Sequence, residues 1–488
     1  MSDNLANNIL PQSEGIAEMS DHETLMWRIS ADPWMNPNGA GLAWLDRPVD
    51  FELFQRQIAN AVAQQPRLRQ KVVDDGPSWM NPRWVPVTSF NLDDHVESIS
   101  LDGSASDSAV LALASRLYTE TLDPSRPVWR FVAIDGLASG RGAVWFMIHH
   151  TIGDGIGQVK MAEAYQSLER DDPGPPPIDL DAIISRAAEQ NDHSAFGRRD
   201  QAKALANQAL SLAKFQANST RKLVGELALW PTDPSRVQDR AAEVGDALKG
   251  LLGPLVALGP ALGGSDTGGS PLWTDRSASR QLEHVTVPLD KLKKAAKSHG
   301  SSINDAFLSV IANATVAYHR DREVDLGCVN TSFVVSTRTK GDKRANAFTP
   351  VALRLSGASA SLPERMSEVH TKALAARHEA AGAGGISSLS GALNMLPQSV
   401  ITSAARAQAS RIDVATSNLR GAPFPVYIAG GRMTGSVTQG PLAGTPCNAT
   451  AFSAENNFDI GLFIDPVAIA EPPAFAENVR AAFDELLS

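Results

Sequence analysis

The sequence predicts an α/β protein built from two units, and three observations support this. Residues 143–148 form a short apolar run, glycines stand at 153 and 155, and apolar residues recur at near-helical spacing from Ile156. This order indicates a buried strand, a sharp turn and a helix. A chain of 488 residues suits two domains better than one. The Pro- and Gly-rich stretch 171–177 is the clearest linker, and we end the first unit there.

Further elements follow from local patterns. Ser20 to Glu23 has capping-box spacing, which predicts a helix start, and Pro66 ends a helix-spaced segment that begins at Phe51. We expect the first 18 residues to be disordered and residues 180 to about 230 to be helical. The other predicted elements are strands at 131–135, 284–287 and 329–338, helices at 289–297 and from 301, with Ser302 or Asn304 as cap, and a hairpin within 447–465.

Composition narrows the class of protein. Hydrophobic residues make up 43% and charged residues 20%, as in globular proteins. The net charge of −10 argues against a nucleic-acid partner. Two cysteines, Cys328 and Cys447, give no disulfide framework and fit a reducing compartment. The polar first residues resemble no signal peptide, and no apolar run is long enough to span a membrane, so we expect a cytoplasmic protein.

The turn after residues 143–148 contains two histidines and one carboxylate. A neutral imidazole can take a proton from an alcohol or an amine near pH 7, so His149 or His150 could act as a general base. Two other interpretations of the histidines remain open. The histidines could be satisfied polar residues at a strand end, or they could bind a metal together with Asp154. Because no third His or Cys follows at ligand spacing, we expect no metal.

The pattern His149-His150-x-x-x-Asp154-Gly155 is the active-site signature of the acyltransferase superfamily with the chloramphenicol acetyltransferase fold. From about residue 18 onward, the sequence resembles one branch, the bacterial wax ester synthase/diacylglycerol acyltransferase family. Pro127-Val128-Trp129 stands where that family has Pro-Leu-Trp, and Asn304-Asp305 matches a second motif. Ser417-Asn418 begins a third motif with one residue inserted before its proline, and Ala345-Asn346 replaces Gly-Asn.

The resemblance implies two chloramphenicol acetyltransferase-like lobes with mixed sheets, and an active-site tunnel between them with His150 at its middle. Four segments are expected: a disordered N-terminus (1–18), an N-terminal lobe (19–175), a helical connector (176–278) and a C-terminal lobe (279–488). Within the connector, the apolar stretch 248–262 is either a packed element or a surface that meets lipid.

The resemblance also implies the reaction. A fatty acyl group would move from acyl-coenzyme A, a co-substrate, to a long-chain alcohol or a diacylglycerol, with no further cofactor. His150 would be the base and His149 an orienting neighbour, while Asp154 would hold the turn by pairing with an arginine such as Arg338. Asn304 would position the substrate or polarise the thioester. No Gly-x-Ser-x-Gly elbow occurs, so we expect direct transfer without an acyl-enzyme.

Other residues have a structural and a functional reading. The family motifs place Asn304, Asp305, Trp129, Ser417 and Asn418 at the substrate and Gly155 in the catalytic turn, although Trp129 is also expected to pack under a strand. The lysines of 291–297 are expected either to be solvated or to bind the phosphates of coenzyme A. His95 is expected at the surface.

Two rival functions share the histidine motif. A condensation-type enzyme would use carrier-bound acyl groups, but no carrier domain is recognisable in the chain. A non-catalytic homologue would only bind lipid, but an intact motif argues against a decayed site. Because the acceptors are insoluble, we expect peripheral, reversible binding to a membrane or lipid-droplet surface.

Overall fold

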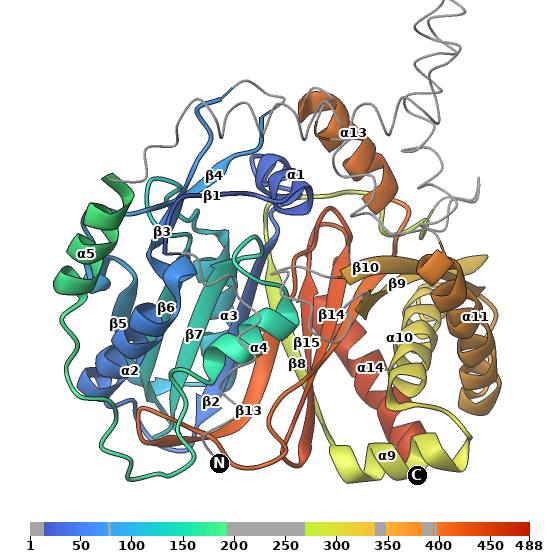
Figure 1. The fold of residues 1–488 in the computed structure, drawn as a ribbon. Helices are drawn as coiled ribbons and strands as arrows, with labels where there is room; N and C mark the ends of the chain where they lie inside the picture. Colours follow the sequence, from blue (N-terminus) through green and yellow to red (C-terminus); the bar gives the residue numbers. More distant parts are fainter. Residues whose placement is uncertain (1–13, 77–79, 193–268, 337–347, 383–393, 395–397) are drawn as a thin grey trace, which may run out of the picture.

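Two mixed sheets dominate the part of the chain that the structure describes. The computed structural model describes residues 14–76, 80–192, 269–336, 348–382, 394 and 398–488 (Figure 1). The first sheet has the order β12 (Tyr427–Ile428), β13 (Gly431–Gln439), β2 (Asn38–Leu45), β7 (Gly142–His149), β6 (Trp129–Leu137) and β5 (Val96–Ala105). The second has the order β10 (Phe348–Ser356), β9 (Cys328–Ser336), β11 (Val414–Arg420), β14 (Cys447–Ala454), β15 (Asn457–Ile464) and β8 (Gln281–Pro288).

Parallel and antiparallel pairs occur in both sheets. Strand β5 runs parallel to β6, and β11 runs parallel to both β14 and β9, while the other pairs are antiparallel. A small third sheet pairs β1 (Ala17–Glu18) and β3 (Gln70–Val73) with β4 (Arg83–Pro86). The predicted α/β fold with mixed sheets is therefore confirmed. The expected disorder of residues 1–18 is wrong at Ala17–Glu18, which pair with Arg83–Trp84, and residues 1–13 lie outside the described part.

The helices cover the sheets in two groups (Figure 1). In the first lobe they are α1 (Asp21–Ile29), α2 (Phe51–Gln64), α3 (Asp107–Thr119), α4 (Gly155–Ala162) and α5 (Leu180–Asp192), with single 3₁₀ turns at Pro66–Arg69 and Leu92–Asp94. In the second lobe they are α9 (Leu289–Ser298), α10 (Ile303–Arg320), α11 (Leu362–Gly382), α13 (Gln398–Ala409) and α14 (Pro472–Leu487). The predicted capping box at Ser20 is present, and Ser302 is the cap of α10.

Strand β2 is buried along its whole length because both faces of the first sheet are covered. Its residues alternate between two apolar cores. Ala43 and Leu45 pack with α2, through residues such as Phe54 and Ile58. Ala40, Leu42 and Trp44 belong to a second core with α3.

That second core joins the two lobes. It combines Tyr118 of α3 and Trp145 of β7 with Leu282 and Phe463 of the second sheet. The ring centroids of Tyr118 and Phe463 lie 4.6 Å apart in a T-shaped arrangement. Trp145 also donates its indole N–H to Gln439 Oε1 at 2.7 Å. The lobes therefore share one apolar core.

The C-terminal half of the chain contributes a strand, β13, to the first sheet. Strand β13 follows β11 of the second sheet in sequence, yet it pairs with β2, with Val437 opposite Leu42. The predicted C-terminal lobe of residues 279–488 therefore gives residues 427–439 to the first sheet. In the predicted connector, the helix α5 is present, residues 193–268 lie outside the described part, and residues 269–280 have no regular structure.

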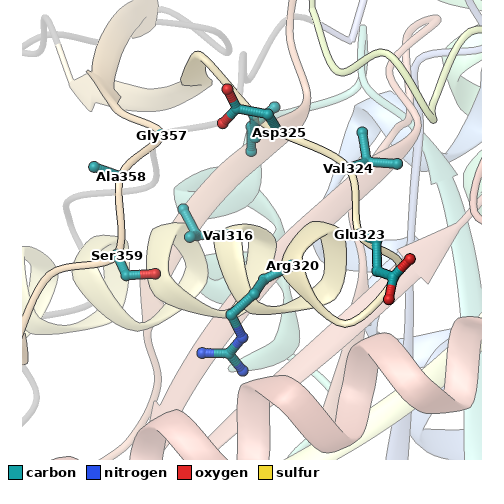
Figure 2. Close-up of a pocket in the computed structure, with 9 residues that line it drawn as sticks. Val316, Arg320, Glu323, Val324, Asp325, Gly357, Ala358 and Ser359 are labelled. Carbon is teal, nitrogen blue, oxygen red and sulfur yellow. The ribbon is translucent and has the colours of Figure 1, made fainter.

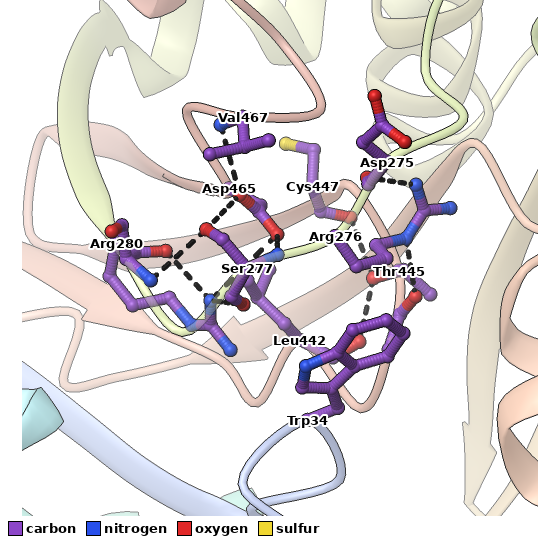
Figure 3. A network of polar contacts seen from close by, with 12 residues as sticks. Trp34, Asp275, Arg276, Ser277, Arg280, Leu442, Thr445, Cys447, Asp465 and Val467 are labelled. Carbon is purple, nitrogen blue, oxygen red and sulfur yellow. Dashed lines mark hydrogen bonds and ion pairs between the residues drawn. The ribbon is translucent and has the colours of Figure 1, made fainter.

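Partly buried polar contacts hold residues 276 and 277 before β8 begins (Figure 3). Ser277 donates its backbone N–H and its hydroxyl to the Asp465 carboxylate, at 2.5 and 2.6 Å. The same carboxylate accepts from the amide of Val467, and Arg276 donates to the carbonyl of Gly444 at 2.8 Å. These bonds hold the start of the second sheet.

Replacement of Phe463 by alanine should lower the free energy of unfolding by about 3–5 kcal/mol, because Phe463 has no exposed surface and its loss leaves a cavity between the lobes. Urea unfolding measures this change. Val467→Ala is the control, since that side chain is 53% exposed and should change stability by less than about 0.5 kcal/mol. Equal losses in the two variants would contradict a shared interlobe core.

Candidate functional site

The turn from His149 to Gly155 has the predicted order of strand, turn and helix. Strand β7 ends at His149 and α4 begins at Gly155. Asp154 is the N-cap of α4 and accepts a hydrogen bond from the amide of Gly157 at 2.9 Å. Such a cap stabilises a helix by about 1 kcal/mol. Asp154 therefore holds the turn, as expected, while its pairing with Arg338 stays a prediction because Arg338 lies outside the described residues.

His149 is a packed residue. It is 5% exposed, and its Nδ1 lies 2.7 Å from the hydroxyl and 3.3 Å from the amide of Thr151. Burial, and then the nearby His150, lower the pKa of His149 to about 3. Because Nδ1 accepts from the Thr151 amide, the neutral ring carries its proton on Nε2. These surroundings fit the orienting role predicted for His149.

His150 is the next residue, but its surroundings differ. It is half-buried, at the first position of the turn, whereas His149, Thr151 and Ile152 are buried. Of the two histidines, only His150 keeps appreciable exposed surface. This difference favours His150 as the reactive member of the pair.

The turn lies against the second lobe. A methyl group built on Gly155 would come within 2.7 Å of the end of the Leu419 side chain, so the start of α4 lies close to a side chain of β11. The motif residues Ser417 and Asn418 are in the same strand, where Ser417 is half-buried and Asn418 exposed. The structure therefore brings the start of α4 to the strand that contains the third motif. Contact of Ser417 or Asn418 with a substrate stays a prediction.

Asp305 has a structural role at the start of α10. It completes a capping box with Ser302, whose amide it accepts at 3.1 Å. The same carboxylate oxygen lies 3.0 Å from His370 Nδ1 of α11. These contacts give Asp305 a structural role, and its contact with a substrate stays a prediction. Asn304, the preceding residue, is half-buried in the same first turn, and its contact with a substrate is untested.

Trp129 is likewise part of the core. It is 1% exposed and donates its indole N–H to the carbonyl of Leu68 at 2.8 Å. Its ring stacks on His95, with centroids 4.4 Å apart, and Phe90 contacts both rings, at 5.2 Å from the centroid of His95 and 6.2 Å from that of Trp129. The packing role expected for Trp129 is confirmed, and its assignment to the substrate site is not supported. The expectation of a surface His95 is wrong, because His95 is 4% exposed and bonds the Trp129 carbonyl.

Two cavities among the described residues lie away from the histidines. One, of about 300 Å³, is in the second lobe between the end of α10 and residues 357–359 (Figure 2). The other, of about 230 Å³, lies between β13 and the β14–β15 hairpin. Neither includes His150 in its lining, so the interlobe tunnel stays a prediction. The apolar stretch 248–262 lies outside the described part of the chain.

The lysines of α9 and the possible metal ligands are the remaining candidates. The lysines of α9 are exposed, and Lys293 lies 3.3 Å from Asp290, so their contact with coenzyme A phosphates remains untested. In the described ranges, no three His, Cys, Asp or Glu side chains gather as metal ligands would. No helix in these ranges has the length and apolar character needed to cross a bilayer.

Sequence reasoning missed three neighbours of the turn. Trp27 of α1 lies with its ring centroid 5.3 Å from that of His149, Thr151 binds His149 Nδ1, and Leu419 covers Gly155. Thr151 is inside the motif and its hydroxyl was a readable signal. Trp27 and Leu419 are far away in sequence, and a single sequence does not show which distant residues meet.

Comparison with known proteins gives consistent matches. The model of the wax ester synthase/diacylglycerol acyltransferase catalytic domain matches residues 11–307, and that of the corresponding C-terminal domain matches residues 345–487. A putative diacylglycerol O-acyltransferase of Mycobacterium tuberculosis is 29% identical over 480 residues, which cover 96% of this chain and 92% of the relative.

Solved structures show the same fold. A wax ester synthase/diacylglycerol acyltransferase from Marinobacter aquaeolei superposes with a TM-score of 0.62 at 15% identity, covering 96% of this chain and 98% of the other. The first condensation domain of the calcium-dependent antibiotic synthetase gives a TM-score of 0.55, also at 15% identity, with 98% of each chain covered. At this identity the likeness establishes the two-lobed fold alone.

The buried state of His149 predicts a pH effect on stability. Its pKa falls from about 6.5 in the unfolded chain to about 3 in the folded one, so the unfolded state binds more protons between these values. The free energy of unfolding should therefore decrease as the pH falls from 6.5 toward 3. Burial also lowers the pKa values of His95 and His319, which contribute in the same direction.

The variant His149→Gln, which has no titrating group at this position, should show a shallower decrease over the same pH range. Urea unfolding at a series of pH values measures both slopes. Identical slopes for the wild type and the variant would mean that His149 is not held neutral by burial.

Proposed function

Because the chain belongs to the wax ester synthase/diacylglycerol acyltransferase family, we propose that it transfers a fatty acyl group from acyl-coenzyme A to the hydroxyl of a long-chain alcohol or a diacylglycerol. The observation that carries this proposal is the turn after β7. It presents the half-buried His150 beside a fully packed, neutral His149, at the point where the first lobe meets β11.

In the proposed reaction His150 acts on the acceptor. Its neutral imidazole takes the hydroxyl proton while the acceptor oxygen attacks the thioester carbonyl. A tetrahedral intermediate forms, its C–S bond breaks, and the departing thiolate takes the proton back from the imidazolium. The products are the ester and free coenzyme A, and the base returns to its starting state.

The oxyanion of the intermediate needs hydrogen-bond donors. The first turn of α4 is a candidate source, because the first N–H groups of a helix have no intrahelical acceptor and attract negative charge. That turn begins at Gly155, five residues after His150. Asn304 is the side-chain alternative that the family motif suggests.

Direct transfer is preferred over an acyl-enzyme because the candidate nucleophiles are buried. Ser270 Oγ lies 2.5 Å from His319 Nε2, as an activated serine would, but both residues are buried and the hydroxyl also accepts from the amides of Leu272 and Trp273. Cys447 and Cys328 are buried, and burial raises the pKa of the Cys447 thiol. These groups have the surroundings of structural residues.

The rival functions give different results with purified protein. Release of free thiol from an acyl-coenzyme A, dependent on hexadecanol or diacylglycerol, is the expected result. Activity only with carrier-bound acyl groups would favour a condensation-type enzyme. Lipid binding without release of thiol would favour a non-catalytic homologue.

Replacement of His150 by alanine should lower the turnover number by about 10²–10⁴-fold, the usual effect of losing a positioned general base. The circular dichroism spectrum should not change, because the side chain is half-buried in a turn. His149→Ala should cost less, and the exposed His299, replaced by alanine, is the control that should keep full activity. A His150→Ala protein with near-normal turnover would refute the assignment of the base.

Direct transfer requires both substrates to be bound together. Initial-rate plots against the two substrates should therefore intersect rather than run parallel. Intact-protein mass spectrometry after mixing with acyl-coenzyme A alone should show no covalent adduct. A stoichiometric acyl adduct that disappears when alcohol is added would establish an acyl-enzyme and overturn the mechanism.

A further inference from the structure

Helix α1 covers the buried histidine of the catalytic turn. The indole of Trp27 meets the ring of His149 edge to face, at 61° between planes and 5.3 Å between centroids. Thr151 binds Nδ1 of this ring, but the buried Nε2 has no hydrogen-bond partner among the described residues. The ring of His149 is therefore held by Thr151 on one side and by packing against Trp27 on another.

The second lobe holds α1 in place. Arg406 of α13 makes two hydrogen bonds to the carboxylate of Asp32, just beyond the end of α1, at 2.5 and 2.6 Å. Its guanidinium also lies 4.5 Å from the ring centroid of Trp34. Gln398, the first residue of α13, donates to the carbonyl of Arg28 at 2.7 Å. Figure 1 shows α1 and α13 next to each other above the two sheets.

Two further bonds reinforce this contact. Arg28 donates to the carbonyl of Asn394 at 2.9 Å, and the side chain of Asn394 donates to the carbonyl of Asp21 at 2.8 Å. Arg28 and Asn394 are both buried. Contacts from residues 394–406 thus reach both ends of α1 and fix where Trp27 stands.

We propose that Trp27 is a positioning residue for His150, and that the Asp32–Arg406 ion pair ties this positioning to the second lobe. The proposal rests on the proposed function, in which His150 is the base. His149 and His150 share a peptide bond, so a tilt of the packed ring moves the backbone that sets the direction of His150. Displacements of about 1 Å at a reacting group can cost about 10²-fold in rate.

This arrangement makes the second lobe part of the base's support. Arg406 of α13 binds Asp32, just beyond the end of α1. Helix α1 contains Trp27, whose ring packs against His149. His149 in turn is the neighbour of His150 in the chain. Trp27 and Arg406 act through other residues and need not touch either substrate. Their loss should therefore lower the turnover number while leaving the Michaelis constants of both substrates near their wild-type values.

The ion pair Arg170–Asp46 is a matched control. It too has two hydrogen bonds, and the Arg170 guanidinium lies 5.4 Å from the ring centroid of Tyr427. The arginine side chains are 36% and 42% exposed at Arg170 and Arg406. Asp46 follows β2 at the end where Leu45 faces Gly142, and His149 is at the other end, roughly 24 Å away by strand length.

The experiment compares Arg406→Ala, Arg406→Lys, Trp27→Ala, Trp27→Phe and Arg170→Ala in the full-length protein. The measurements are turnover with acyl-coenzyme A and hexadecanol, the pH profile of kcat/KM, and melting temperature. We expect Arg406→Ala to lower kcat roughly tenfold and Trp27→Ala roughly a hundredfold. The conservative variants Arg406→Lys and Trp27→Phe should recover most of the rate. In the two alanine variants, the midpoint of the acid limb of the kcat/KM pH profile should shift.

Arg170→Ala should keep kcat and the pH profile even if its melting temperature falls as far as that of Arg406→Ala. The double variant Trp27→Ala/Arg406→Ala should be no slower than Trp27→Ala alone, because both residues act by one route. Additive losses, or an equal loss of kcat in the Arg170 control, would overturn the proposal. So would unchanged kcat in Trp27→Ala.

Hydrogen exchange of the peptide around residues 146–158 gives a measure that does not depend on activity. Exchange should rise in Arg406→Ala and Trp27→Ala and not in Arg170→Ala. If the wild type releases no thiol, the proposed function fails, yet this measure still tests the contact. If the wild type is active and exchange in the turn is the same in all variants, the positioning proposal alone fails.

Discussion

The apolar core shared by the two lobes is the constraint on which the rest of the structure depends. Tyr118, Trp145 and Phe463 come from three distant parts of the sequence and bury one another between the sheets. Because this interior is buried and packed, the two sheets are held in a fixed relative position. Only then can Leu419 lie against Gly155 and the residues of α13 reach α1. The histidine turn is thus built by the first lobe and enclosed by the second.

Two adjacent imidazoles acquire different properties from their surroundings. His149 loses its contact with solvent, bonds Thr151 and stays neutral well below pH 7. His150 keeps part of its surface exposed. In the proposed mechanism, these different surroundings make His149 the support and His150 the reactive group, as neighbouring titratable residues take separate tasks in active sites.

The parts that sequence predicts well are those set by nearby residues. The turn at 149–155 was predictable because an apolar run, two glycines and a helical period follow one another, and the cap at Ser302 because its pattern spans four residues. Contacts between distant residues were not predictable. The prediction that His95 lies at the surface was wrong because Phe90 and Trp129 pack against its ring. No local pattern reveals that Trp27 contacts His149. Asp305, which belongs to a family motif, also completes the capping box of α10.

Strand β13, which the C-terminal half of the chain contributes to the first sheet, has a consequence for folding during synthesis. Until residues 431–439 leave the ribosome, β2 has an open edge on the side where β13 will pair. Open strand edges recruit other chains, and late pairings of residues that are far apart in sequence form slowly. The N-terminal lobe therefore cannot complete its sheet as an independent unit during synthesis. We expect protein quality control to act on the nascent chain mainly through this edge, and lobes expressed separately to aggregate unless both halves are supplied together.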